Sequence, residues 1–310
     1  MLRHLARLTA GAGSLVVAFA LSASAAPLPG PGTAAQVAKL VATANRIEVL
    51  PNNLVPSLPQ AGNDDAVAYY PVTEPGCTSR TQCVFGDLHG THTVVLFGDS
   101  HALMWLTSFV PIAVKYRFRL VLLWKASCPA TDVSVWDPVA NSISRSCNSY
   151  RTAEEGLIHK LNPSLVLLAS RNTDITGAGN KPISAPTWRA GLEATITAVR
   201  TRTTRVAVVG DIIPFNAVLP DCLAANPSHV QLCSVTNPNP KVTNHFSDDL
   251  AAAKAARVPY VNPQRWLCTS VCSPVIGNMI SYYNNQHVSA TYAAFLSGVW
   301  ATALRPLLPR

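Results

Sequence analysis

A series of short, continuous apolar runs is the strongest pattern in this chain. The runs lie at residues 94–97, 120–124, 165–169, 205–210 and 259–261. Continuous apolar runs are typical of parallel strands that are covered on both faces, whereas half-exposed strands alternate apolar and polar residues. The pattern therefore predicts a sheet of five parallel strands.

Helical periodicity fills the intervals between these runs. Trp188, Leu192 and Ile196, for example, share one helical face. Ser247 is expected to cap one of the helices, with acidic residues in the first turn after it. Strands that alternate with helices indicate an α/β fold, and we expect a three-layer α/β/α sandwich. One predicted helix begins near His101, and four others cover about 149–161, 186–199, 247–256 and 289–304.

The N-terminus has the pattern of an export signal. Arg3 and Arg7 give a basic start, residues 15–21 form a short apolar core, and Ala23-Ser24-Ala25 is a small-residue cleavage pattern. These features predict a secretory signal peptide over residues 1–25, with cleavage near Ala25. Retention of the leader as a membrane anchor is the alternative. In either case we expect the protein to be secreted or to lie in the cell envelope.

The rest of the chain divides into an arm and a domain. Residues 26–75 are rich in proline, with one helix-like patch at 34–46, and predict an arm laid across the domain formed by 76–310. A hydrophobic content of 48% with 13% charged residues indicates a folded core. The net charge of +8 is not gathered into basic runs, so nucleic acid is not an expected partner, and an anionic envelope surface fits better.

Eight cysteines follow the leader in four close pairs, which in an exported protein predicts four local disulfides. Five residues separate Cys77 from Cys83, and three residues separate Cys268 from Cys272. Neither spacing is a Cys-x-x-Cys zinc motif, and no metal site is expected. His89 and His92 are interpreted as two exposed loop residues. The four pairs are Cys77 with Cys83, Cys128 with Cys147, Cys222 with Cys233, and Cys268 with Cys272.

The first apolar run ends in Gly98-Asp99-Ser100-His101, directly before a predicted helix. A serine at this position lies beside backbone N–H groups that have no helical acceptor. Ser100 can therefore be a nucleophile with a nearby oxyanion site. The other interpretation is structural, with Asp99 or Ser100 simply capping the helix.

A nucleophilic serine needs a histidine to take its proton. His101 starts the same helix and cannot readily fold back onto Ser100. His287 is the best candidate, because it lies after the fifth predicted strand and enters the last helix, which places it at the carboxyl edge of the sheet. Asp211 follows the fourth strand at the same edge, and it is either a loop acceptor or a substitute for the acid of a catalytic triad.

These residues resemble the SGNH hydrolase superfamily, and more closely the exported SGNH domain that is often fused to integral-membrane acyltransferases. The resemblance rests on Gly98-Asp99-Ser100-His101, on Ser127-Cys128-Pro129, on the other cysteine pairs and on the C-terminal histidine. It covers roughly residues 45–305 and implies a flavodoxin-like sandwich. The family implies Ser100 as nucleophile, with its N–H in the oxyanion hole, and His287 as general base.

Two positions depart from the family pattern. The family has an aspartate three residues before the histidine, where this chain has Asn284. An asparagine carbonyl can accept a hydrogen bond from the histidine Nδ1–H, but it cannot offset the positive charge that develops on the ring. The second departure concerns the family's oxyanion glycine and asparagine: no single glycine after the second strand stands out, and Asn172 is the candidate for the asparagine. Asp99 and Asp211 are further candidates for oxyanion or substrate contacts.

The sequence therefore predicts an exported serine esterase or O-acyltransferase that acts on acyl groups of envelope glycans or glycolipids. The resemblance implies no cofactor, and it makes a membrane acyltransferase a candidate partner. The alternative is a catalytically weak or inactive SGNH-fold protein that binds the envelope. Four tryptophans are expected in the core or in the walls of the site: Trp105, Trp124, Trp136 and Trp188. One or two of them could stack on a sugar.

Overall fold

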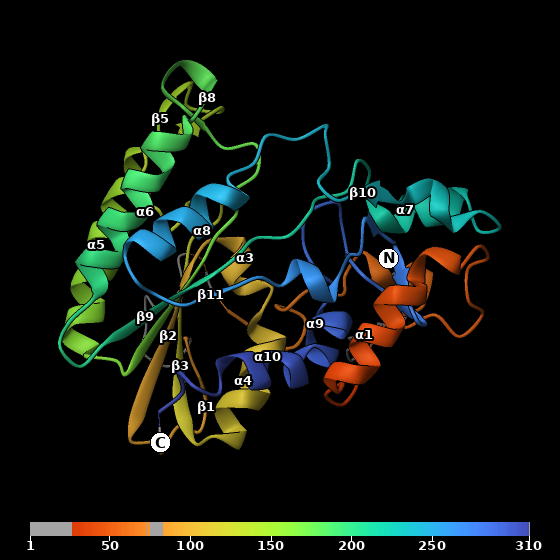
Figure 1. Ribbon diagram of the computed structural model, residues 1–310, viewed down its shortest axis with the longest axis horizontal. Coiled ribbons are helices and arrows are strands. Elements are labelled where there is room, and N and C mark those ends of the chain that lie inside the picture. Colours follow the sequence, from red (N-terminus) through yellow and green to blue (C-terminus); the bar gives the residue numbers. More distant parts are fainter. Residues whose placement is uncertain (1–26, 73, 75–82, 310) are drawn as a thin grey trace, which may run out of the picture.

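A computed structural model describes residues 27–72, 74 and 83–309 of the chain. The predicted signal peptide and Cys77 lie outside these residues. The apolar runs form the centre of a sheet with the strand order β1-β3-β2-β6-β9-β11 (Figure 1). Its strands are β1 (Val84–Gly86), β2 (His92–Gly98), β3 (Phe118–Trp124), β6 (Leu165–Ala169), β9 (Arg205–Val209) and β11 (Tyr260–Val261).

Five of the six strands are parallel, and each corresponds to one predicted apolar run. In chain order these five lie as 2-1-3-4-5, the doubly wound arrangement of flavodoxin-like folds. The sixth strand, β1, corrects the expectation of a five-stranded sheet: it pairs antiparallel with β3 at the edge. With only three residues it leaves no apolar run in the sequence.

Helices cover both faces of the sheet, which confirms the three-layer sandwich (Figure 1). Helices α5, α6 and α8 lie on one face, and α4, α9, α10 and α1 lie on the other. The helices are α1 (Ala34–Thr43), α2 (Leu58–Ala61), α3 (Ser100–Leu103), α4 (Leu106–Lys115), α5 (Arg145–Leu161), α6 (Ala185–Val199), α7 (Leu219–Ala225), α8 (Phe246–Ala255), α9 (Ala290–Phe295) and α10 (Ser297–Leu304). Short two-residue strands pair in the loops as β4 (Trp136–Asp137) with β5 (Ser142–Ile143), β7 (Thr176–Gly177) with β8 (Lys181–Pro182), β10 (Val235–Thr236) with β12 (Val271–Cys272), and β13 (Val275–Ile276) with β14 (Met279–Ile280).

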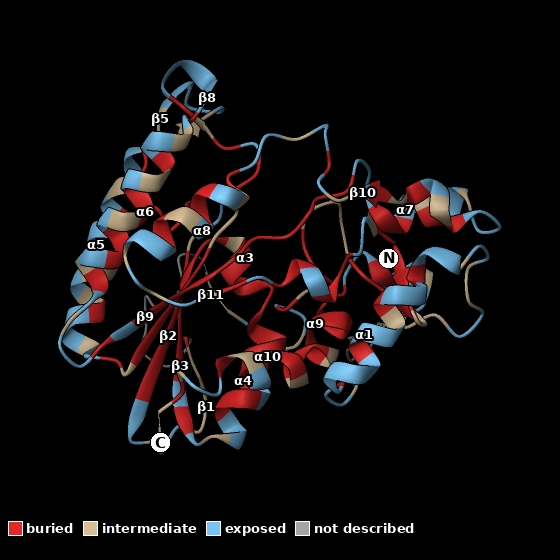
Figure 2. Cartoon of the chain, in the orientation of Figure 1, coloured by how far each residue is buried: buried red, intermediate tan, exposed pale blue. Residues whose placement is uncertain are grey.

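Alternation along β2 explains why its run is continuously apolar. Val94 and Leu96 face the core that contains α4, while Val95 and Phe97 face the core that contains α6. Successive side chains of a strand point to opposite faces, so both sets are buried when both faces are covered. The central strands are accordingly buried along most of their length (Figure 2).

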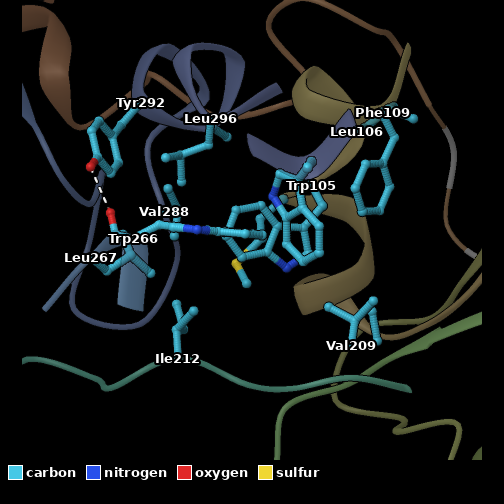
Figure 3. Packing of buried hydrophobic residues seen from close by; sticks show 14 of the residues in the cluster. Trp105, Leu106, Phe109, Val209, Ile212, Trp266, Leu267, Val288, Tyr292 and Leu296 are labelled. Atoms are coloured by element: carbon cyan, nitrogen blue, oxygen red, sulfur yellow. Dashed lines mark hydrogen bonds between the residues drawn. The ribbon is translucent and has the colours of Figure 1, made fainter. Parts of the chain in front are cut away.

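Three tryptophans join the helices on the α4 side of the sheet. The ring of Trp300 packs edge-on against Trp105 and Trp266, with centroids 5.0 and 4.7 Å away. Tyr292 donates a hydrogen bond of 2.7 Å to the backbone oxygen of Trp266 (Figure 3). This cluster ties the helix after β2 to the C-terminal helices, and it thereby fixes the loop before α9 relative to the end of β2.

Three details of the predicted helices are wrong. The helix after β2 is divided into α3 and α4, and the final helix is divided into α9 and α10. Ser247 does not cap α8, because the helix begins at Phe246, the residue before Ser247, and His245 takes the N-cap position. Ser289, by contrast, does cap α9, and its hydroxyl accepts a hydrogen bond from the N–H of Tyr292.

Three of the four predicted disulfides are present, Cys128–Cys147, Cys222–Cys233 and Cys268–Cys272. Each joins two cysteines that follow one another among the cysteines of the chain, as expected. The fourth pair, Cys77 with Cys83, involves a residue outside the described part of the chain.

The described part of the N-terminal arm packs on the α9 side of the molecule. Helix α1 coincides with the predicted helix-like patch and buries Val37 and Val41. Farther along, Asp64 accepts hydrogen bonds from Ala290 N–H through its backbone oxygen and from Thr291 N–H through its carboxylate. The arm therefore holds the start of α9. Within residues 27–72, 74 and 83–309, no helix is both long and apolar enough to cross a bilayer.

Candidate active site

Ser100 stands where β2 turns directly into α3, at the carboxyl edge of the sheet. Gly98 makes this turn possible, because a Cβ at that position would lie 1.7 Å from the backbone oxygen of Ala169 on β6. Ser100 is the first residue of α3, so its N–H has no acceptor within the helix. Its side chain is partly exposed, and reagents from solution can therefore reach it.

Asp99 has a structural role at this turn. Its carboxylate accepts hydrogen bonds from the N–H of His101 at 2.8 Å and from the N–H of Arg171 at 3.0 and 3.1 Å. Burial raises the pKa of Asp99, and the nearby His101 and these N–H donors oppose that rise. Asp99 is almost fully buried, with 1% exposed, and its side chain caps the start of α3. Its role in oxyanion or substrate contacts stays a prediction.

His287 lies against Ser100, although 187 positions separate them in the sequence. Its Nε2 is 2.8 Å from Ser100 Oγ. The loop that carries it is fixed by Tyr282, whose hydroxyl donates to the backbone oxygen of Ile213 at 2.9 Å. On the other side, the ring of Tyr283 stacks on the His287 ring, with centroids 5.5 Å apart. The structure therefore brings together the serine and the histidine singled out in the sequence.

Asn284 contacts His287 with its amide nitrogen. Its Oδ1 accepts hydrogen bonds from the backbone N–H groups of Gln286 and His287, at 2.8 and 2.9 Å. These two donors fix the orientation of the amide, because its NH₂ group cannot accept a hydrogen bond. As a result, Asn284 Nδ2 lies 2.9 Å from His287 Nδ1, while Oδ1 is farther away at 3.2 Å.

This contact assigns the proton of the neutral His287 ring. Since Asn284 Nδ2 can only donate and is the nearer atom, the contact favours His287 Nδ1 as the acceptor, with the ring proton on Nε2. Nε2–H then donates to Ser100 Oγ. A general base requires the opposite tautomer, with the proton on Nδ1. The expected contact of the Asn284 carbonyl with Nδ1 is present only as the longer one, at 3.2 Å, because backbone N–H groups of its own loop already bind that oxygen.

The His287 ring is strongly disfavoured as a cation. Burial, followed by the positive charges of His101 and Arg171, lowers the pKa of His287 from 6.5 to about 2. No carboxylate among the described residues contacts its Nδ1, where a triad acid would lie. His287 is therefore neutral across the physiological pH range.

A second histidine lies beside this pair. The His101 ring packs edge-on against His287, with centroids 4.9 Å apart, and its Nδ1 is 2.5 Å from Asp211 Oδ1. Burial by itself would lower the pKa of His101, but the Asp211 carboxylate outweighs it and the pKa is raised. Asp211 therefore pairs with His101 and not with His287, so it does not lie in the position of a triad acid.

Asn172 does not face Ser100. Its side chain is fully buried, and its Nδ2 donates to Asp249 Oδ2. Trp188 Nε1 donates to the other oxygen of Asp249 at 2.7 Å, and burial raises the pKa of Asp249 to about 7. These contacts correct the assignment of Asn172 as an oxyanion donor. The preceding residue, Arg171, is the one whose charge acts on His287.

Other singled-out residues lie away from Ser100. Trp105, Trp124 and Trp188 are buried, as expected for core residues, and Trp136 is partly exposed in β4. His92 begins β2 at the opposite end of the strand from Ser100, within 3.1 Å of Ser164 Oγ. Among the described residues, no group of three or more histidine, cysteine or acidic side chains could hold a metal ion.

Ser100 and His287 therefore lie together at the carboxyl edge of a doubly wound sheet, at the switch point where such folds bind their ligands. The family model "SGNH domain (fused to AT3 domains)" matches residues 68–302. The chain therefore belongs to this SGNH family.

Several solved structures are similar to this chain. The periplasmic domain of a lipopolysaccharide acetyltransferase from Salmonella ser. Paratyphi A is similar with a TM-score of 0.53 at 17% identity, over 67% of this chain and 81% of that one. An aryl esterase from M. smegmatis has a TM-score of 0.45 at 14% identity, over 70% of this chain and all of that one (100%). A carbohydrate acetylesterase from Sinorhizobium meliloti has a TM-score of 0.43 at 14% identity, with the same coverage of 70% and 100%. A search of curated proteins finds no match.

Proposed function

We propose that this SGNH domain transfers acyl groups through Ser100, as an esterase or an O-acyltransferase of low intrinsic rate. The observation that carries the proposal is the 2.8 Å contact between Ser100 Oγ and His287 Nε2 at the carboxyl end of β2. A serine hydroxyl becomes nucleophilic when an adjacent imidazole can take its proton. The N–H of Ser100, at the start of α3, is available to an oxyanion.

The reaction has two halves. Ser100 Oγ attacks the ester carbonyl while its proton passes to His287 Nε2, and the carbonyl oxygen becomes an oxyanion at the Ser100 N–H. The intermediate collapses to an acyl-serine, and His287 gives the proton to the leaving alkoxide. In the second half, water or a sugar hydroxyl gives its proton to His287 and attacks the acyl-serine. The C–Oγ bond then breaks, and His287 returns the proton to Ser100 Oγ.

Asn284 makes the first proton transfer slow. His287 must first move its ring proton from Nε2 to Nδ1, against the amide N–H of Asn284 that points at Nδ1. No negative charge contacts Nδ1 to stabilise the imidazolium that forms. The same observation favours a second candidate function, in which the domain binds an acylated envelope component and turns it over little or not at all.

For the substrate we propose acyl groups carried by envelope glycans or glycolipids, and for the location an exported position. The family of SGNH domains fused to AT3 domains supports a membrane acyltransferase as the partner. The similar Salmonella structure is a periplasmic domain of a lipopolysaccharide acetyltransferase, which supports both the location and the class of acceptor. The predicted signal peptide over residues 1–25 agrees with export.

Covalent labelling of Ser100 tests the proposal. The purified protein is incubated with a fluorophosphonate probe, and the modified peptide is identified by mass spectrometry. Labelling is expected at Ser100, and the Ser100→Ala variant should lose it. Ser146→Ala is the matched control, because Ser146 is exposed on α5 and its hydroxyl contacts Ser144 Oγ at 3.2 Å instead of a histidine. A folded protein that takes up no probe at Ser100 contradicts the enzymatic function and leaves the binding function.

A further inference from the structure

Arg171 is a cation beside Ser100 that has no acid partner. It lies two residues beyond β6, the strand that pairs with β2 so that Ala169 is next to Gly98. The backbone N–H of Arg171 donates to the carboxylate of Asp99, the residue before Ser100, which brings Arg171 close to Ser100 at the carboxyl edge of the sheet. The Arg171 side chain is partly exposed, and it takes part in none of the ion pairs found among the described residues.

The position of Arg171 is fixed by bonds that leave the end of its guanidinium unused. Its backbone N–H donates to the Asp99 carboxylate, and its Nε donates to the backbone oxygen of Thr173 at 2.8 Å. Its two terminal nitrogens donate no hydrogen bond within the part of the chain that is described. A held, unpaired guanidinium offers parallel N–H donors that match a carboxylate or a phosphate.

The surroundings of Arg171 reinforce its positive charge. The two carboxylates that accept from backbone N–H groups of the Arg171 segment have other partners as well, Asp99 the N–H of His101 and Asp211 the His101 ring. The tautomer assigned to His287 directs an N–H donor toward Ser100, and the positive charges of His101 and Arg171 lower the pKa of His287. The site therefore offers donors and positive charge, without an unengaged acceptor on these residues.

We propose that Arg171 binds an anionic group, carboxylate or phosphate, that the substrate carries close to its acyl bond. The inference rests on the function proposed above and narrows its substrates to esters with a neighbouring negative charge. A half-ester of a dicarboxylic acid carries this charge on the acyl side. An acylated phosphoglycan or phosphoglycolipid carries it on the alcohol side.

Binding of unreactive ligands tests the inference without requiring turnover. The full chain is titrated with adipic acid monoamide and with its neutral counterpart adipamide, and in a second arm with glycerol 3-phosphate and with glycerol. Shifts of the Ser100 amide and His287 ring signals in NMR spectra report binding at the site. In at least one arm the anion is expected to bind about 10- to 100-fold more tightly than its neutral counterpart, as for a charge-assisted hydrogen bond. The arm that shows the preference identifies carboxylate or phosphate.

Two substitutions at Arg171 and one control complete the design. Arg171→Gln removes the charge, keeps the backbone N–H to Asp99, and should abolish the preference for the anion. Arg171→Lys keeps a charge without the planar fork and should retain part of the preference. Arg119→Gln removes one exposed positive charge from β3 and should retain all of it.

The outcomes separate this inference from the proposed function. Equal affinity for charged and neutral ligands in both arms overturns the role of Arg171. A preference that survives in Arg171→Gln does so as well. A protein that binds the anion through Arg171 but takes up no fluorophosphonate refutes catalysis by Ser100 and leaves the binding site in place.

Discussion

Replacing Asn284 with aspartate should convert the Ser100 site from a slow to a fast one. The loop already provides the geometry for a carboxylate. One oxygen would keep the two backbone N–H donors that Asn284 Oδ1 accepts. The other would replace Nδ2, 2.9 Å from His287 Nδ1, and accept Nδ1–H. The proton would then leave Nε2, which becomes free to accept the proton of Ser100.

The size of the effect follows from the two backbone hydrogen bonds that Asn284 would lose if its carbonyl turned toward His287 Nδ1. To accept from Nδ1–H the amide would have to turn over, which would set its NH₂ group against the N–H groups of Gln286 and His287. Each unsatisfied donor costs roughly 1–3 kcal/mol, so the productive tautomer is disfavoured by roughly 2–6 kcal/mol. At about 1.4 kcal/mol per factor of ten, this is about 30-fold to 10⁴-fold in rate. Serine proteases that lose the triad acid to asparagine are slowed by about 10⁴-fold, at the upper end of this range.

The assay is the rate of fluorophosphonate labelling and of short-chain ester hydrolysis in wild type and Asn284→Asp. Asn285→Asp is the matched control, because it adds the same charge to the same partly exposed loop stretch one residue farther on. We expect an increase of about 30-fold to 10⁴-fold for Asn284→Asp, from the tautomer argument above, and little change for the control.

The pH profile gives a second readout. His287 acts as a base only when neutral, and with a pKa of about 2 it stays neutral in wild type as the pH falls. A carboxylate beside Nδ1 raises that pKa, so activity of Asn284→Asp should decline on acidification where wild type does not. Nitrogen-15 shifts of the His287 ring should also show Nε2–H in wild type and Nδ1–H in the variant. An Nδ1–H tautomer in wild type, or an equal gain in Asn285→Asp, would refute the reasoning.

Two further predictions concern stability. Asp211→Asn removes the partner of His101 and should lower the free energy of unfolding by about 3 kcal/mol, measured by urea denaturation. The pKa of His101 is higher in the folded than in the unfolded chain. The pair therefore stabilises the fold fully when the pH is below the unfolded-state pKa of His101, and this stabilisation is lost as the pH rises through the folded-state pKa. The difference between wild type and Asp211→Asn should therefore narrow as the pH rises, and a constant difference would contradict the ion pair. The double variant Cys128→Ser with Cys147→Ser opens a loop between cysteines 19 positions apart and should cost about 3 kcal/mol by the same measurement. An unchanged midpoint would show that this bridge adds no stability.

The strands were predictable because burial on both faces leaves a signal in every residue of a run. Leu165–Ala169, for example, is apolar throughout and forms β6 with the predicted bounds. β1 left no such signal, since it pairs on one side only and has three residues. Helix ends were predictable where a side chain makes the cap, as at Ser289. They were not predictable at Ser247, where α8 begins without a side-chain cap.

The sequence by itself determined the sheet, the position of Ser100 at its carboxyl edge, and His287 as the histidine that reaches it. These follow from periodicity and from the rule that parallel strands end at one edge. Only the tertiary structure decided the direction of each polar contact. Asn172 turns to Asp249 while Arg171 remains unpaired, Asp211 takes His101, and the backbone of its own loop takes the oxygen of Asn284. Each contact depends on which donor lies within about 3 Å of the acceptor in the folded chain. The residue types along the chain do not specify that distance.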